Sequence, residues 1–186
     1  MPATAIKSSI PDNFALYPEN EKDIGTEIAV LYDKGRFKLL AAEIHPFTAH
    51  PGRSFIIMDL QDKEGSIYRF VAVHLPGGPK AKAARIELTQ HLLRNFDIQI
   101  PTLLMGDMNG SPCAIRNQFE RTATLLHMDM PFKPIGVPYS THVNTALEAS
   151  CLDLIYLANG EGNAFFANAF SQEVEKIAEL LKSLRP

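Results

Sequence analysis

The chain has 186 residues, of which 46% are hydrophobic and 21% are charged, and this length fits a single domain with its own core. The composition excludes a wholly disordered chain, a collagen and a coiled coil. The 18 basic and 21 acidic residues give a net charge of −3. This balance argues against nucleic-acid binding through overall positive charge, although it is compatible with a local basic groove.

No apolar run approaches the ~18 residues of a membrane-spanning helix, so we expect no transmembrane segment. The first residues lack the basic flank and the apolar stretch of a signal peptide. The two cysteines, Cys113 and Cys151, form no CxxC pair and are interpreted as free thiols in a reducing compartment. The sequence therefore predicts a cytoplasmic protein, with signal-free export as the alternative.

Residues 1–24 show no clean hydrophobic period and are predicted to be a poorly ordered lead-in to one domain over residues 25–186. Apolar bursts then predict four strands, at residues 28–32, 37–44, 54–60 and 68–74. The first two are expected to pair as a hairpin, and four strands in succession without a helix indicate an antiparallel sheet. The stretch 45–53 is interpreted as a variable connection, with substrate recognition as the alternative.

A helix is predicted over residues 79–96, where an apolar residue recurs every four positions and forms a stripe that covers a sheet. The cations of this helix could attract an anionic substrate or form a solvated face; they are Lys80, Lys82, Arg85 and Arg94. A strand at residues 102–105, a second helix at 113–127 and a strand at 152–158 are expected to follow. Ser171 is expected to cap a last helix.

Three of the predicted strands carry a polar residue at one end, and His74 is the first of these. It follows the apolar run 71–73 and precedes a loop that is rich in proline and glycine. An imidazole at the rim of a sheet can donate a hydrogen bond to a phosphate oxygen or act as an acid. The alternative is a hydrogen-bonded structural histidine.

Asp107 and Asn109 follow the predicted strand at residues 102–105, and Gly106 allows a sharp turn between them and the strand. In an extended segment, residues two apart point the same way. A carboxylate and an amide in this arrangement suit water activation and the orientation of a phosphate or a metal-bound oxygen. The alternative is a plain turn, which Gly, Asp and Asn also favour.

Asp153 lies at the start of an otherwise apolar strand. Burial of an unpaired carboxylate is costly, so we expect a partner such as a histidine or a metal ion. The alternative is a capping or turn aspartate.

The order of these segments resembles that of the endonuclease/exonuclease/phosphatase superfamily, which has the deoxyribonuclease-I-like fold, over most of the chain from Gly25 to Ala158. Residues 104–109 (LMGDMN) resemble the family's Gly-Asp-Phe-Asn segment, with Met108 in place of the aromatic residue. Residues 73–75 (VHL) resemble the end of its Asn-Thr-His-Leu segment, although Ala72 and Val73 replace the Asn-Thr pair. Residues 150–155 (SCLDLI) resemble its Ser-Arg-Ile-Asp-Tyr-Ile strand.

This resemblance implies an α+β fold, a four-layer αββα sandwich of two mostly antiparallel sheets, and phosphoester hydrolysis that depends on Mg²⁺ or Mn²⁺. It implies that His74 binds or protonates the phosphate and that Asp107 positions the attacking water. Asn109 would orient the phosphate, Asp107 and Asn109 would bind the metal, and Asp153 would hold a histidine base. Thr141 resembles a family threonine near the site, and Arg85 is assigned to substrate binding. The substrate would be a nucleic acid, a nucleotide or a phospholipid headgroup.

Two parts of the family pattern are missing from the sequence. The family's metal-binding glutamate, which follows a glutamine on an early strand, has no counterpart here, and Glu21, Asp23 and Glu27 are poor substitutes. The closing Asp-His segment is absent after Asp153, and His142 precedes that residue. The sandwich is therefore expected to be incomplete at both ends, as in a fragment, a chain completed by a partner, or a degenerate member. The alternative functions are a binding or non-enzymatic domain and an unrelated α/β domain.

Overall fold

A computed structural model describes residues 10–19, 28–78, 81–135, 142–143, 149–150 and 153–158 of the chain. The elements in chain order are β1 (Phe14–Tyr17), β2 (Val30–Asp33), β3 (Lys38–Phe47), β4 (His50–Gln61), β5 (Ile67–His74), α2 (Ala81–Arg94), β6 (Thr102–Asp107), α3 (Pro112–Leu125), β7 (Phe132–Ile135), β8 (His142–Val143), β9 (Ala149–Ser150) and β10 (Asp153–Ala158). The predicted helix from Ser171 lies outside the described residues. None of the described helices is long and apolar enough to cross a membrane.

The largest sheet has six strands in the order β3-β4-β5-β6-β10-β7. Its neighbouring strands are antiparallel, except that β5 and β6 are parallel. The sequence is compatible with this parallel pair, because α2 separates the two strands and supplies the crossover that parallel neighbours need. The prediction of an antiparallel arrangement from residue 37 to residue 74 is confirmed for β3, β4 and β5.

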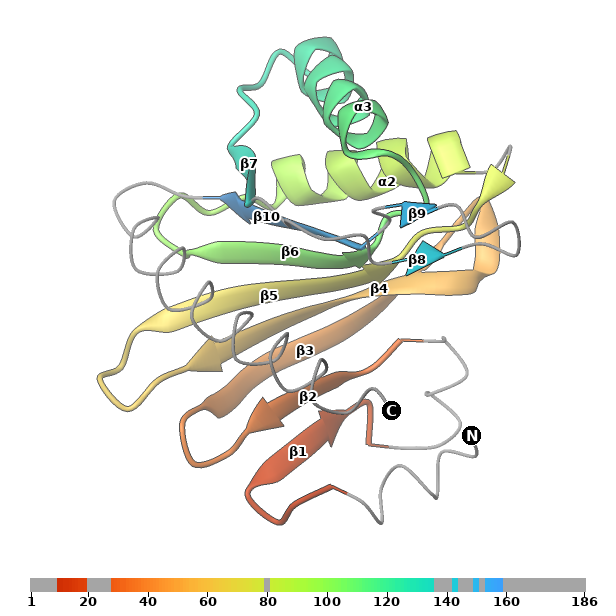
Figure 1. The fold of residues 1–186 in the computed structure, drawn as a ribbon. Coiled ribbons are helices and arrows are strands. Elements are labelled where there is room, and N and C mark those ends of the chain that lie inside the picture. The colour runs from red at the N-terminus through yellow and green to blue at the C-terminus, as the bar shows by residue number, and fades with distance from the viewer. Residues whose placement is uncertain are drawn as a thin grey trace.

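The two helices of the described residues, α2 and α3, cover one face of this sheet (Figure 1). The apolar stripe of α2, which includes the buried Ala84, Leu88 and Leu92, packs into the core on this face together with Ile115 and Phe119 of α3. The amphipathic pattern therefore predicted the packing face of α2 correctly.

The opposite face of β3, β4 and β5 is covered by a second sheet, in which β1 pairs with β2. Val30 and Tyr32 of β2 and Tyr17 of β1 pack against the buried Ile56 and Met58 of β4. The chain is thus α+β with two stacked sheets and helices outside the larger one (Figure 1). Strands β8 and β9 pair with each other as a third, two-stranded sheet.

Two expectations about the start of the chain are wrong. Residues 14–17 form strand β1 within the predicted poorly ordered lead-in, and β2 pairs with this strand and not with residues 37–44. Asp33 causes the second difference, because its carbonyl accepts from Phe37 N–H at 2.9 Å and its carboxylate accepts from Gly35 N–H at 2.7 Å. This turn carries the chain from one sheet to the other, so β2 stacks on the larger sheet.

His91 of α2 makes the stability of the fold depend on pH. Its ring lies 4.4 Å from that of His45 and 5.2 Å from that of Phe55, measured between centroids. Burial lowers the pKa of His91 from its ordinary value of 6.5, and the charges of His45 and Arg69 add to this, whereas Glu43 and Glu87 oppose it. The unfolded chain therefore takes up the proton more readily, and stability that is complete above pH ~6.5 is lost as the pH falls.

We expect the free energy of unfolding to fall between about pH 7 and pH 5, and His91→Gln to weaken this dependence, because the variant has no imidazole to protonate. Denaturant unfolding at a series of pH values measures both. His127→Asn, which removes an exposed imidazole, is the control and should keep the wild-type slope. Equal slopes in wild type and His91→Gln would contradict the assignment.

Candidate active site

Three of the predicted site residues come together at one edge of the six-stranded sheet. The parallel register of β5 and β6 pairs His74 with Asp107, and the antiparallel register of β6 and β10 pairs Asp107 with Asp153. Residues that are 33 and 46 positions apart in the sequence (107 − 74 and 153 − 107) thus form one row across three neighbouring strands. For Asp153 this placement rests on the backbone.

The first two members of this row point away from the helices. Val73 and Leu104 belong to the core under α2 and α3, and side chains alternate along a strand. His74 and Asp107 therefore lie on the opposite face of the six-stranded sheet. Strands β1 and β2 cover another part of this same face. The Nε2 atom of His74 is 3.6 Å from Oδ2 of Asp107, and the two side chains are 27% and 32% exposed. The pair is partly shielded from water but open to a ligand.

Arg53 is a functional candidate whose contact with His74 the sequence did not reveal, although it ends the stretch 45–53 for which substrate recognition was the alternative. The stretch 45–53 contains the paired ends of β3 and β4 and is not a plain loop, and Arg53 lies in β4. Its Nη1 lies 2.7 Å from Nε2 of His74 and also contacts Nδ1 of the same ring. A guanidinium only donates hydrogen bonds, so the imidazole nitrogen accepts. In the sequence, Arg53 directly precedes the apolar run 54–60. This run lies in the strand next to β5, which ends at His74.

Asn109 is attached to the end of β6 by its own hydrogen bonds. Its N–H donates to Oδ1 of Asp107 at 2.8 Å, and its Nδ2 donates to the carbonyl oxygen of Leu75 at 2.6 Å. The residue has a φ of 46°, in the left-handed region that asparagine tolerates. Asp107 and Asn109 thus form a turn, and this turn holds the side chain of Asn109 next to Asp107. A turn and a functional site are therefore compatible interpretations of this motif.

The residues that flank Asp107 explain how its strand is held. Gly106 has a φ of 134°, and a Cβ on it would lie 3.0 Å from the carbonyl carbon of Val73 and closer still to its oxygen. Only glycine allows this approach of β6 to β5. Met108 is fully buried in the core beneath the helices, so the position where the family has an aromatic residue is a packing position in this chain.

The two predicted substrate-binding residues have different outcomes. Arg85 lies on α2, and its Nη2 donates to the main-chain oxygen of Asn109 at 2.7 Å, so its contact is with the turn. Burial lowers the pKa of this guanidinium. Thr141 lies outside the described residues.

The oxygen ligands at this edge suit a hard divalent cation. Asp107 offers a carboxylate, and no described residue donates a hydrogen bond to Oδ1 of Asn109. Mg²⁺ in proteins is typically held by one or two carboxylates, with waters and substrate oxygens as its other ligands. The described residues contain no group of three or more His, Cys, Asp or Glu that could enclose a metal ion. The ligand set therefore fits a hydrated cation shared with a substrate, and not an all-protein cage.

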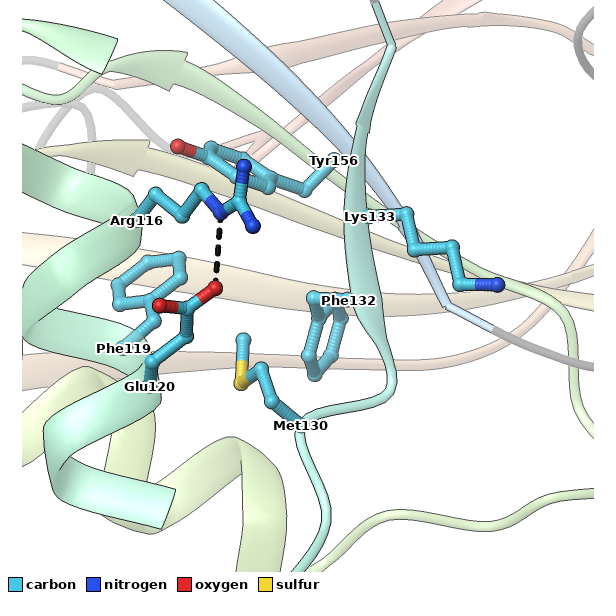
Figure 2. A pocket seen from close by; sticks show the side chains of 7 residues that line it. All are labelled: Arg116, Phe119, Glu120, Met130, Phe132, Lys133 and Tyr156. Carbon is cyan, nitrogen blue, oxygen red and sulfur yellow. Dashed lines mark hydrogen bonds and ion pairs between the residues drawn. The ribbon is translucent and has the colours of Figure 1, made fainter. Parts of the chain in front are cut away.

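A separate pocket of about 360 Å³ lies between α3 and the strands β7 and β10 (Figure 2). It is lined by Arg116, Phe119, Glu120, Met130, Phe132, Lys133 and Tyr156. Arg116 Nε donates to Oε1 of Glu120 at 2.8 Å, and Figure 2 shows this pair among the aromatic side chains of the pocket. Tyr156 belongs to the core under the helices, so this pocket opens on the helix-covered face, opposite to the side chains of His74 and Asp107.

No protein-family model matches this sequence, and no curated protein sequence is detectably similar to it. Solved structures do match. Humanized D. rerio TDP2 matches with a TM-score of 0.62 at 14% identity, over 87% of this chain and 68% of that one. An endonuclease/exonuclease/phosphatase family protein from Bacteroides thetaiotaomicron matches with a TM-score of 0.61 at 15% identity, over 83% and 63%. The human Nocturnin catalytic domain matches with a TM-score of 0.52 at 21% identity, over 70% and 51%.

These similarities define the fold. The chain has the endonuclease/exonuclease/phosphatase fold, as the order of its motifs predicted. It covers between 51% and 68% of the length of these three structures.

Proposed function

We propose that this chain is a phosphoester hydrolase that depends on a divalent metal ion. The observation that carries the proposal is the register that places His74, Asp107 and Asp153 in one row. The fold supports it, because structures with the endonuclease/exonuclease/phosphatase fold match 83–87% of the chain. The guanidinium of Arg53 and the imidazole of His74 lie at one sheet edge with the carboxylate of Asp107. Together with a bound metal ion, these groups suit the stabilisation of negative charge on a phosphorus centre.

Each residue of the row has a proposed role. Arg53 and His74 bind a phosphate oxygen, and His74 delivers a proton to the leaving oxygen. Asp107 orients the attacking water and accepts one of its protons, Asn109 orients the phosphate, and Asp153 completes the row. The water oxygen bonds to phosphorus as the ester P–O bond breaks, and the departing oxygen takes up the proton that His74 delivers. A bound Mg²⁺ or Mn²⁺, held by Asp107 and Oδ1 of Asn109, would polarise the phosphoryl oxygen.

The substrate class is open among nucleic acids, nucleotides and phospholipid headgroups. D. rerio TDP2, whose structure was solved with a single-strand DNA product, matches over 72% of this chain with a TM-score of 0.53. We therefore place single-stranded nucleic acid first among the candidates. We further propose a cytoplasmic protein with a four-layer αββα architecture.

Hydrolysis of a chromogenic phosphodiester and of the matching monoester by the purified chain tests the proposal. The assay is run with Mn²⁺, with Mg²⁺ and with a chelator. We expect turnover with either metal and none with the chelator, and the ratio of diester to monoester rates separates nuclease-like from phosphatase-like chemistry. A well-folded sample that turns over neither substrate would favour the alternative, a degenerate domain that binds without catalysis.

A further inference from the structure

A guanidinium lies directly behind the turn that carries Asp107 and Asn109. We propose that Arg85 of α2 is a positioning residue, which holds Asn109 in its left-handed conformation and thereby fixes the side chains that the proposed hydrolysis uses. This inference rests on the proposed function, and it assigns Arg85 a role other than contact with the substrate.

The fit between Arg85 and the turn is close. Its Nη2 donates to the carbonyl oxygen of Asn109 at 2.7 Å. A Cβ on Gly110 would lie 2.6 Å from this Nη2 and 3.1 Å from Cζ, with Cδ1 of Ile115 at 3.0 Å on its other side. The guanidinium therefore packs against the backbone at Gly110, where a larger residue would push it away.

The charge of Arg85 is not matched by a carboxylate. No acidic side chain among the described residues forms an ion pair with it, and its Nε is buried without a hydrogen-bond partner there. Burial lowers the pKa of the Arg85 guanidinium. A side chain that only attracted an anionic substrate would extend into water, as Lys82 on the same helix does. Arg85 instead meets the negative end of a main-chain carbonyl dipole.

Three hydrogen bonds fix Asn109, and Arg85 makes one of them. The other two run from Asn109 N–H to Asp107 and from Asn109 Nδ2 to Leu75. A left-handed conformation costs free energy in a residue other than glycine, so it persists only where its surroundings determine it. Without the bond to the carbonyl oxygen, the peptide between Asn109 and Gly110 can rotate. The bond from Asn109 to Asp107 then loosens, and the carboxylate and amide oxygens lose their relative placement.

The test compares Arg85→Met, Arg85→Lys and the control Arg121→Met, at an exposed arginine of α3, in steady-state hydrolysis of the phosphodiester. Because displacement of reacting groups by about 1 Å can cost 10²-fold in rate, we expect Arg85→Met to lower kcat about 10- to 100-fold with KM nearly unchanged. Arg85→Lys keeps a donor on a similar stem and should recover part of kcat. Arg121→Met should leave both constants unchanged. A higher KM with unchanged kcat in Arg85→Met would overturn the proposal in favour of substrate attraction.

A second measurement needs no activity. Amide hydrogen exchange at Asn109 and Gly110 should be faster in Arg85→Met than in wild type. In Arg85→Lys it should be slower than in Arg85→Met, and in Arg121→Met it should equal that of wild type. Unchanged exchange in Arg85→Met would overturn the positioning role. If the wild-type chain has no turnover, the proposed function fails, and the exchange rates still decide whether Arg85 holds the turn.

Discussion

Replacement of Gly106 with alanine is expected to lower the free energy of unfolding by about 4 kcal/mol, the sum of a strained φ and a steric clash with backbone. The new Cβ would meet the main chain of Val73, with its carbonyl carbon at 3.0 Å and its nitrogen at 3.1 Å. Backbone at the centre of a sheet has little freedom to move, so β6 must separate from β5. Denaturant unfolding measures the loss.

Gly78→Ala is the matched control for this substitution. Gly78 also has a positive φ, of 66°, but a Cβ there would have no neighbour within 4 Å. It should therefore lose only the conformational part, about 1 kcal/mol. Equal losses for the two variants would contradict the close approach of β6 to β5 that places Asp107 beside His74.

Asp107→Asn is expected to lower metal-dependent hydrolysis about 10³-fold, because it removes the negative charge that orients water and binds the cation. The asparagine keeps an oxygen that can accept from Asn109 N–H, so the fold and the turn should survive. Kinetics with Mn²⁺ and a thermal melt of the same sample separate the two effects.

The control for this variant is Asp129→Asn, which removes one exposed carboxylate from the segment between α3 and β7. It should retain wild-type turnover. Activity of Asp107→Asn within tenfold of wild type would remove Asp107 from the proposed mechanism.

Much of the larger sheet was predictable because its signals are local. The period of four in α2 and the apolar runs of β4, β5, β6 and β10 each depend on neighbouring residues, and the helix between β5 and β6 is long enough to connect a parallel pair. The order of His74, Asp107 and Asp153 at strand ends led to the right fold. Their alignment in one row depends on register, which follows from pairing across the sheet and not from any one segment.

The misses have physical causes of the same kind. Residues 14–17 form a strand because β2 offers a pairing edge and β4 offers an apolar face, and neither is visible in a short segment with neighbouring prolines. Arg53 reaches His74 across a strand pair, so no spacing in the sequence reveals the contact. The hydrogen bond from Arg85 to Asn109 joins α2 to the turn after β6, so no single segment of the sequence reveals it.

The most direct test is a crystal structure of the chain grown with Mn²⁺ and inorganic phosphate, with anomalous scattering used to locate the metal. We predict an anomalous peak at a coordination distance of roughly 2 Å from a carboxylate oxygen of Asp107, with phosphate between this peak and the side chains of His74 and Arg53. Manganese or phosphate bound elsewhere, with Asp107 and His74 in contact with neither, would contradict the assignment of this row as the active site.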